Sequence, residues 1–235
     1  MARRRTLLPL LSALSLLPAC SGPSLLNAVV PRNGYQLERD LPYGEGPRRT
    51  LDLYVPSTAR AGTPLIVFFY GGRWDSGTKD WYRFVAQAFA ARGYATAVPD
   101  YRVFPEVRYP AFLEDAAAAV AWLGAQRRKQ GLGDGPIYLM GHSAGAHIAA
   151  MLTLDARWLE GAGVDRCATI AGAVGLAGPY DFLPLTDPRV MADWFANKGV
   201  DKQKFVDAYN SFAVNGRVKR SEDMTRSYDV PGTPA

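Results

Sequence analysis

A serine between two glycines has the surroundings in this sequence that best suit chemistry. Residues 141–145 read Gly-His-Ser-Ala-Gly and stand between a short apolar run and a stretch with helical character. In a G-x-S-x-G pattern between a strand and a helix, the serine sits in a strained turn that exposes its hydroxyl and tolerates only small neighbours. The helix N-terminus behind it favours developing negative charge. The context therefore favours a nucleophilic Ser143 over a glycine turn that merely packs tightly.

A second pair of glycines could serve the same reaction. Residues 70–74 read Tyr-Gly-Gly-Arg-Trp and directly follow another apolar run. Attack of a serine on an acyl group builds an oxyanion, which preorganised backbone N–H groups stabilise where no side chain is in the way. We therefore predict an oxyanion hole formed by Gly71, Gly72 and the N–H of Ala144. An ordinary glycine turn is the alternative.

A serine nucleophile also needs a general base, and histidine is the most frequent one. The chain contains two histidines, His142 and His147. His142 precedes the nucleophile, and its side chain is expected to point away from Ser143. His147 lies one helical turn later and could lean back toward Ser143, although a buried structural histidine is the favoured interpretation. Asp181 could be the acid, but no later histidine is available for it to orient.

The elements that must position these residues alternate along the chain. Apolar or alternating runs predict strands, and amphipathic or alanine-rich runs that end at glycine predict helices. Strands are expected over residues 49–55, 65–70, 94–98, 137–140 and 168–174, and helices over 80–92, 111–130 and from about residue 143. The first strand is expected to be half-buried. This alternation predicts an α/β fold with a mostly parallel sheet covered on both sides.

Four segments stand in order between residues 35 and 190. Residues 70–77 are similar to an HGG-x-W-x-x-G segment, with Tyr70 in place of the usual histidine; residues 100–115 follow a DYR…PE…P…ED pattern, residues 141–147 read GHSAGAH, and residues 178–181 read GPYD. Together they resemble lipases and esterases related to hormone-sensitive lipase, the arylformamidases and the feruloyl-esterase-like carboxylesterases. Tyrosine at the first position changes the pocket wall but leaves the backbone donors in place.

The resemblance implies an α/β-hydrolase fold over residues 35–190, a three-layer sandwich that is incomplete at its C-terminal side. It implies hydrolysis of a small carboxylic ester, or of a related acyl amide, through an acyl-serine intermediate. No cofactor and no metal are implied. Four charged residues of the 100–115 stretch are interpreted as packing and ion-pair residues that brace the oxyanion loop: Asp100, Arg102, Glu114 and Asp115.

The C-terminal residues have a different character. Up to residue 191 the chain has eighteen Arg and two Lys, whereas the remainder has three Arg and four Lys, and the strand–helix alternation stops. Residues 191–235 resemble the late helical segment of DsbA-type thiol:disulfide oxidoreductases, with Pro234 at the position of their cis-proline. We therefore expect a hybrid chain joined near residue 190, whose esterase-like part is impaired because the triad histidine and acid are not found. The alternatives are a non-catalytic exported protein with an esterase-like pocket and an oxidoreductase fragment without its C-x-x-C.

The N-terminus is typical of an export signal. Residues 3–5 are three arginines, and the apolar stretch that follows closes on Leu-Pro-Ala-Cys at residues 17–20. Residues 1–19 are predicted to be a signal peptide and residues 20–34 a polar tether. The closing pattern resembles a lipobox, which implies a lipid on Cys20 and a periplasmic protein anchored to the outer membrane. Cleavage by an ordinary signal peptidase, giving a soluble secreted protein, is the alternative.

Charge and cysteine content argue against several other functions. The formal net charge of +5 falls to +2 without the three arginines of the signal, and no basic stripe with interleaved aromatics suggests nucleic-acid binding. The two cysteines, Cys20 and Cys167, are far apart and form no C-x-x-C, so neither a redox site nor a zinc site is indicated. A membrane is expected as a partner only through the lipid anchor.

Overall fold

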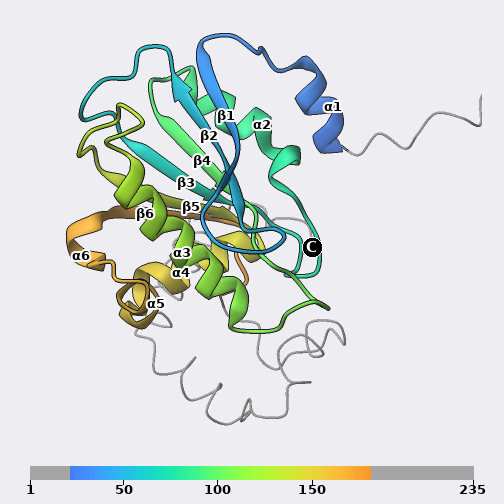
Figure 1. The fold of residues 1–235 in the computed structure, drawn as a ribbon. Coiled ribbons are helices and arrows are strands. Elements are labelled where there is room, and N and C mark those ends of the chain that lie inside the picture. The colour runs from blue at the N-terminus through green and yellow to red at the C-terminus, as the bar shows by residue number, and fades with distance from the viewer. Residues whose placement is uncertain (1–21, 181–235) are drawn as a thin grey trace, which may run out of the picture.

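Six strands form one mixed sheet in the computed structural model, which describes residues 22–180 (Figure 1). The strands are β1 (Tyr35–Pro42), β2 (Thr50–Pro56), β3 (Leu65–Phe69), β4 (Ala95–Pro99), β5 (Ile137–His142) and β6 (Ile170–Leu176). Their order across the sheet is β1-β2-β4-β3-β5-β6. The last four are mutually parallel, whereas β1 and β4 are both antiparallel to β2. The expected mostly parallel α/β sheet is confirmed.

Helices pack on both faces of this sheet. They are α1 (Gly22–Val29), the short 3₁₀ helix η1 (Lys79–Tyr82), α2 (Arg83–Ala90), α3 (Ala111–Gln126), α4 (Ala144–Leu154), α5 (Ala156–Gly161) and α6 (Arg166–Thr169). α3, α4 and α5 contact one another, whereas α2 contacts β2 and β4. The chain passes through α2 from β3 to β4 and returns through α3 to β5. Right-handed crossovers in opposite directions place α2 and α3 on opposite faces, which gives three layers.

The centre of the sheet brings the two glycine-containing segments together. All five residues of β3 are apolar and buried, as expected for a strand covered on both faces. β3 pairs in parallel with β5, from Leu65 opposite Ile137 to Phe69 opposite Gly141. The carboxyl ends of the two strands therefore stand side by side. The segments that follow them begin at the same edge of the sheet.

The N-terminal side of the sheet differs from expectation. β2 is buried from Leu51 to Pro56 rather than half-buried, because α2 and Lys79 of η1 contact it in addition to its neighbouring strands β1 and β4. The edge strand is β1, which was not predicted from the sequence. It carries charged side chains and a bulge between Glu38 and Leu41. Both features are common in edge strands, which must avoid pairing with another chain.

Two predicted helices are shorter in the structure. The helix expected over residues 80–92 consists of η1 followed by α2, and the helix expected over residues 111–130 ends at Gln126. The glycines expected to close them, Gly93 and Gly131, have φ angles of +83° and +73°. This left-handed conformation is the one that favours glycine after a helix.

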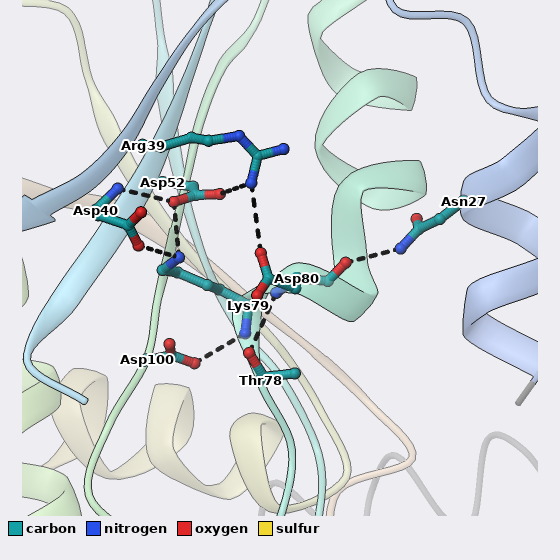
Figure 2. A network of polar contacts seen from close by, with 8 residues as sticks. All are labelled: Asn27, Arg39, Asp40, Asp52, Thr78, Lys79, Asp80 and Asp100. Carbon is teal, nitrogen blue, oxygen red and sulfur yellow. Dashed lines mark hydrogen bonds and ion pairs between the residues drawn. The ribbon is translucent and has the colours of Figure 1, made fainter. Parts of the chain in front are cut away.

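The predicted tether contains a helix that is attached to the domain. α1 lies within residues 20–34, and Asn27 fixes it to η1 and α2 (Figure 2). The Asn27 Nδ2 donates a hydrogen bond of 2.8 Å to the carbonyl of Asp80, and its Oδ1 accepts one of 3.0 Å from the N–H of Phe84. The N–H of Phe84 belongs to the first turn of α2, where no carbonyl of the helix itself can serve as its partner.

Several predicted segments lie outside the described residues. They are the signal peptide, Cys20, Asp181, and residues 191–235 with the junction before them. Between residues 22 and 180, no helix combines the length and the apolar character needed to cross a bilayer.

Candidate active site

The predicted nucleophile occupies a strained turn between β5 and α4. Ser143 has φ 53° and ψ −121°, a conformation that side chains rarely adopt. Its neighbours have to be glycines, because a Cβ on Gly141 would collide with the carbonyl of Gly145, and a Cβ on Gly145 with the carbonyl of Phe69. The N–H of Ser143 donates to the carbonyl of Leu176 at 2.8 Å, which ties the turn to β6. The geometry is that of the elbow expected from the sequence.

The loop after β3, residues 70–77, lies directly against this serine; we call it the glycine loop. A Cβ on Gly71 would lie only 2.9 Å from the Cβ of Ser143. Gly72 has φ +138°, and its carbonyl accepts hydrogen bonds from the N–H groups of Asp75 and Ser76 at 2.9 and 3.0 Å. The backbone of a tight turn thus approaches the serine as closely as the absence of side chains permits.

The three predicted oxyanion donors differ in their surroundings. Ala144 begins α4, so its N–H has no carbonyl one turn earlier in the helix and can bind an anion. The N–H of Gly71 is instead directed to the hydroxyl of Tyr82; this bond lowers the pKa of Tyr82, although burial outweighs it and raises the pKa overall. Gly71 therefore lets the loop backbone approach Ser143 closely, while the N–H groups of Gly72 and Ala144 are better placed to donate hydrogen bonds to an oxyanion.

His147 lies inside the protein. Only 3% of its surface is exposed, and burial lowers its pKa to about 3. Its ring stands edge-on against Trp74 of the glycine loop, with ring centroids 5.3 Å apart. A histidine with this pKa is neutral at pH 7 and resists protonation there. These features favour the structural interpretation of His147 over a role as general base.

His142 lies closer to the site than expected. Its side chain was expected to point away from Ser143, yet its Nδ1 is 3.0 Å from the position that a Cβ on Gly71 would take. The Cβ of Ser143 is 2.9 Å from the same position. His142 is also exposed to solvent. The alternation of side chains along a strand could not predict the orientation of His142, because β5 ends at this residue and the elbow begins.

Tyr70, in place of the usual histidine, anchors the first residue of the glycine loop. Its side chain is fully buried and stacks on Tyr101, with ring centroids 4.7 Å apart. Its hydroxyl donates to Asp100 Oδ1 at 2.7 Å, and its carbonyl accepts from the Tyr101 hydroxyl at 2.7 Å. Burial raises the pKa of Asp100, an effect that the hydrogen bond from Tyr70 opposes. Asp100 thus braces the loop, as interpreted from the sequence.

The other charged residues of the 100–115 stretch fall into two groups. Arg102 binds the fully buried Asp115 through Nε and Nη2, each at 2.8 Å, and Arg49 adds an Nε–Oδ1 contact of 3.1 Å. This pair confirms the ion-pair interpretation. Glu114, by contrast, is exposed on α3. Within residues 22–180, no group of three or more His, Cys, Asp or Glu side chains could hold a metal ion.

Comparison with known families gives a match over most of the chain. The BD-FAE family model matches residues 51–216. The matched segment contains the glycine loop, the elbow and the whole of the sheet from β2 onward. It also continues past residue 190, into the part for which a DsbA-type resemblance was expected.

Curated relatives have related activities. The chain is 32% identical over 193 residues to isoprenylcysteine alpha-carbonyl methylesterase ICME of Arabidopsis thaliana. This alignment covers 78% of this chain and 44% of the relative. It is 32% identical over 160 residues to kynurenine formamidase of Danio rerio, and this alignment covers 68% of this chain and 52% of that relative. The chain thus spans about half the length of these relatives or less.

A solved structure supports the fold. Esterase B from Lactobacillus rhamnosis, inhibited by a tributyrin phosphonate, superposes with a TM-score of 0.65 at 25% identity. The alignment covers 80% of this chain and 63% of the esterase. Together with the observed sheet order, this confirms an α/β-hydrolase fold.

Proposed function

Because this chain belongs to the BD-FAE family and has the α/β-hydrolase fold, we propose that it hydrolyses carboxylic esters, or closely related acyl amides, through an acyl-serine intermediate. The observation that carries the proposal is the strained Ser143, with φ 53°, held beside the glycine loop. The esterase and formamidase activities of the relatives support the same class of acyl transfer. The substrate is a small ester, and no nucleic acid and no cofactor take part.

The proposed reaction has two steps. The Ser143 Oγ attacks the carbonyl carbon as the carbon–oxygen bond to the alcohol breaks, and the serine proton passes through water to the oxygen of the leaving alcohol. Water cleaves the acyl-serine, which releases the acid and restores the hydroxyl. In both steps the N–H groups of Gly72 and Ala144 stabilise the oxyanion, since α4 directs the positive end of its dipole to the same point.

We further propose that turnover by this chain is slow. Its two histidines, His142 and His147, lie within four residues of Ser143, whereas the triad histidine of this fold comes from a later loop, and the burial and lowered pKa of His147 also argue against proton transfer by it. Without a base the serine attacks as a neutral hydroxyl, which is a poor nucleophile. Enzymes without a triad member typically keep about 10³–10⁴-fold acceleration over water, from the oxyanion hole and binding. A non-catalytic protein with an esterase-like pocket is the second candidate.

A fluorophosphonate probe tests the nucleophile. Attack by the serine on phosphorus displaces fluoride and leaves a stable adduct, so labelling needs no complete turnover. We expect a single adduct on Ser143 by peptide mass spectrometry, lost in Ser143→Ala and kept in Ser57→Ala, which changes an exposed serine on another loop. Labelling that survives Ser143→Ala would show that the elbow serine is not the nucleophile.

Hydrolysis of a short-chain nitrophenyl ester separates the two candidates. A slow rate that depends on Ser143 supports the impaired esterase, and a rate equal to that of Ser143→Ala supports the non-catalytic protein. His147→Asn is expected to keep the slow rate per folded molecule. A fast rate that both Ser143→Ala and His147→Asn abolish would instead make His147 the base.

We also propose that the protein is exported and carries a lipid on Cys20. The support is the sequence pattern of residues 1–20 alone. A diacyl anchor together with an amide-linked chain binds a membrane far more firmly than a single acyl chain does.

A further inference from the structure

A single arginine in the hairpin between β1 and β2 contacts both ends of the glycine loop. The Arg48 Nη2 donates a hydrogen bond of 3.0 Å to the hydroxyl of Tyr70 and one of 2.7 Å to the carbonyl of Gly77. Its Nε donates a third, of 2.9 Å, to the carbonyl of Tyr101. Tyr70 begins the glycine loop and Gly77 ends it, and Tyr101 follows β4. One guanidinium therefore connects the hairpin between β1 and β2, the glycine loop and the residues after β4, which are far apart in the sequence.

The two ends of the loop are also packed against each other. Gly77 has φ +102°, and a Cβ there would lie 2.7 Å from both the carbonyl oxygen of Gly71 and the ring of Tyr70. The Tyr101 hydroxyl donates to the carbonyl of Tyr70 at 2.7 Å. The contacts of Arg48 thus close a ring of hydrogen bonds through Tyr101 and Tyr70. Movement of the loop would break several of these bonds together.

Arginine suits this position for a chemical reason. Its planar guanidinium offers five donors in a fixed fork and stays charged at any working pH, whereas the compact ammonium of lysine cannot serve three separated acceptors in the same way. Arg48 also precedes residue 51, where the match to the BD-FAE family begins. Its three partners, Tyr70, Gly77 and Tyr101, lie within the matched segment.

We propose that Arg48 is a positioning residue that holds the glycine loop at the distance from Ser143 at which its backbone can stabilise an oxyanion. It touches no substrate and acts through Tyr70, Gly77 and Tyr101. The catalytic part of this inference rests on the proposed ester hydrolysis. The structural part, that Arg48 immobilises the loop, does not.

Amide hydrogen exchange tests the structural part on the full chain. In Arg48→Met we expect amides of residues 71–77 to exchange at least about tenfold faster, since a charge-assisted hydrogen bond changes a local opening equilibrium by such a factor. Arg48→Lys should fall between this variant and the wild type, and peptides from β3 and β5 should keep their protection. Arg49→Met is the matched control, because Arg49 belongs to the same hairpin but contacts Asp115. Unchanged exchange of the loop in Arg48→Met, or equal loss of protection across the sheet, would overturn the proposal.

The rate of fluorophosphonate labelling at Ser143 tests the catalytic part. We expect Arg48→Met to label about 10- to 100-fold more slowly, because displacement of a positioned group by about 1 Å can cost that much. Arg49→Met should label within about twofold of the wild type, as expected for a change that leaves the positioned groups in place. Faster loop exchange with an unchanged labelling rate would refute the catalytic part. If the wild type itself takes no label, the proposed function fails, and hydrogen exchange alone then decides the role of Arg48.

Discussion

At the scale of single residues, the site depends on positions where a Cβ is excluded. Gly141 and Gly145 flank a serine whose backbone is itself in the left-handed region, and each has a backbone carbonyl where its side chain would be. The constraint at Gly141 is local, because it involves Gly145 four positions later, whereas that at Gly145 comes from Phe69 at the end of the strand paired with β5. The local constraint is why a five-residue pattern was sufficient to predict the conformation at Ser143.

We expect Gly145→Ala to destabilise the protein by about 1–3 kcal/mol, because the added methyl overlaps the carbonyl of Phe69 and forces the backbone to move. Gly124→Ala is the matched control, as Gly124 lies in α3 with open space around its Cα. There the change should stabilise by about 0.5–1 kcal/mol, the usual gain for alanine within a helix. Urea unfolding measures both. Equal effects of the two substitutions would contradict the steric account of the elbow.

His147 gives a pH dependence of stability with a defined sign. Burial lowers its pKa to about 3 in the folded chain, against about 6.5 when unfolded. The contribution of neutral His147 to the free energy of unfolding is therefore fully present above about pH 6.5. It decreases as the pH falls toward 3, by at most about 1.4 kcal/mol per pH unit. We expect His147→Gln to flatten this decrease between about pH 6 and 4, a window set by the same two pKa values. Urea unfolding of the wild type and of His147→Gln at several pH values provides the test, and identical slopes in the two proteins would exclude the effect.

At the scale of elements, a buried ionic cluster joins β1, β2 and η1 (Figure 2). The Lys79 Nζ lies 2.9 Å from Asp52 Oδ1 and 2.7 Å from Asp40 Oδ1, and both Lys79 and Asp52 are almost fully buried. Burial by itself lowers the pKa of Lys79, but the hydrogen bonds that its ammonium donates to Asp40 and Asp52 outweigh this effect and raise the pKa above its ordinary value. The N–H of Lys79 also donates to Asp100 at 2.8 Å. The cluster therefore fixes the N-terminal strands relative to the loop that carries the site.

We expect Lys79→Met to cost about 3–5 kcal/mol, because it leaves the buried Asp52 carboxylate with Arg39, 3.6 Å away, as its remaining ion-pair partner among the described residues. Adding Asp52→Leu should restore most of the loss. Urea unfolding of the single and double variants measures this coupling. Arg128→Met, which breaks an exposed pair with Asp134, should change stability little. A double variant no more stable than Lys79→Met would show that the charge of Asp52 is not the cause.

The sequence could predict the central elements better than the contacts that fix them. β3, β5 and the elbow follow from apolar runs and from glycine spacing, both of which are local properties. Arg48 and Lys79 were not predicted, because their partners lie in other segments and no spacing in the sequence relates them. β2 was expected to be half-buried because an alternating run does not tell whether elements from another segment, here α2 and η1, cover its polar face.

At the scale of the whole molecule, we expect the mature chain to begin at a lipid-modified Cys20. Membrane fractionation of the expressed protein and mass spectrometry of its N-terminus measure this. Cys20→Ser should release the protein from the membrane fraction, and Cys167→Ser, which changes an exposed cysteine of the domain, should not. An unmodified N-terminus at any residue beyond 20 would contradict the anchor.

The docking of α1 by Asn27 changes what such an anchor would do. A free tether of fifteen residues could extend by about 50 Å, and the domain could then search a thick layer of solvent above the lipid. Since α1 begins at Gly22 and is bound to the domain, one residue, Ser21, separates Cys20 from this helix, a span of at most about 7 Å. A protein held so closely by its lipid anchor would rotate little relative to the membrane. It would therefore stay close to esters that reach the headgroup surface.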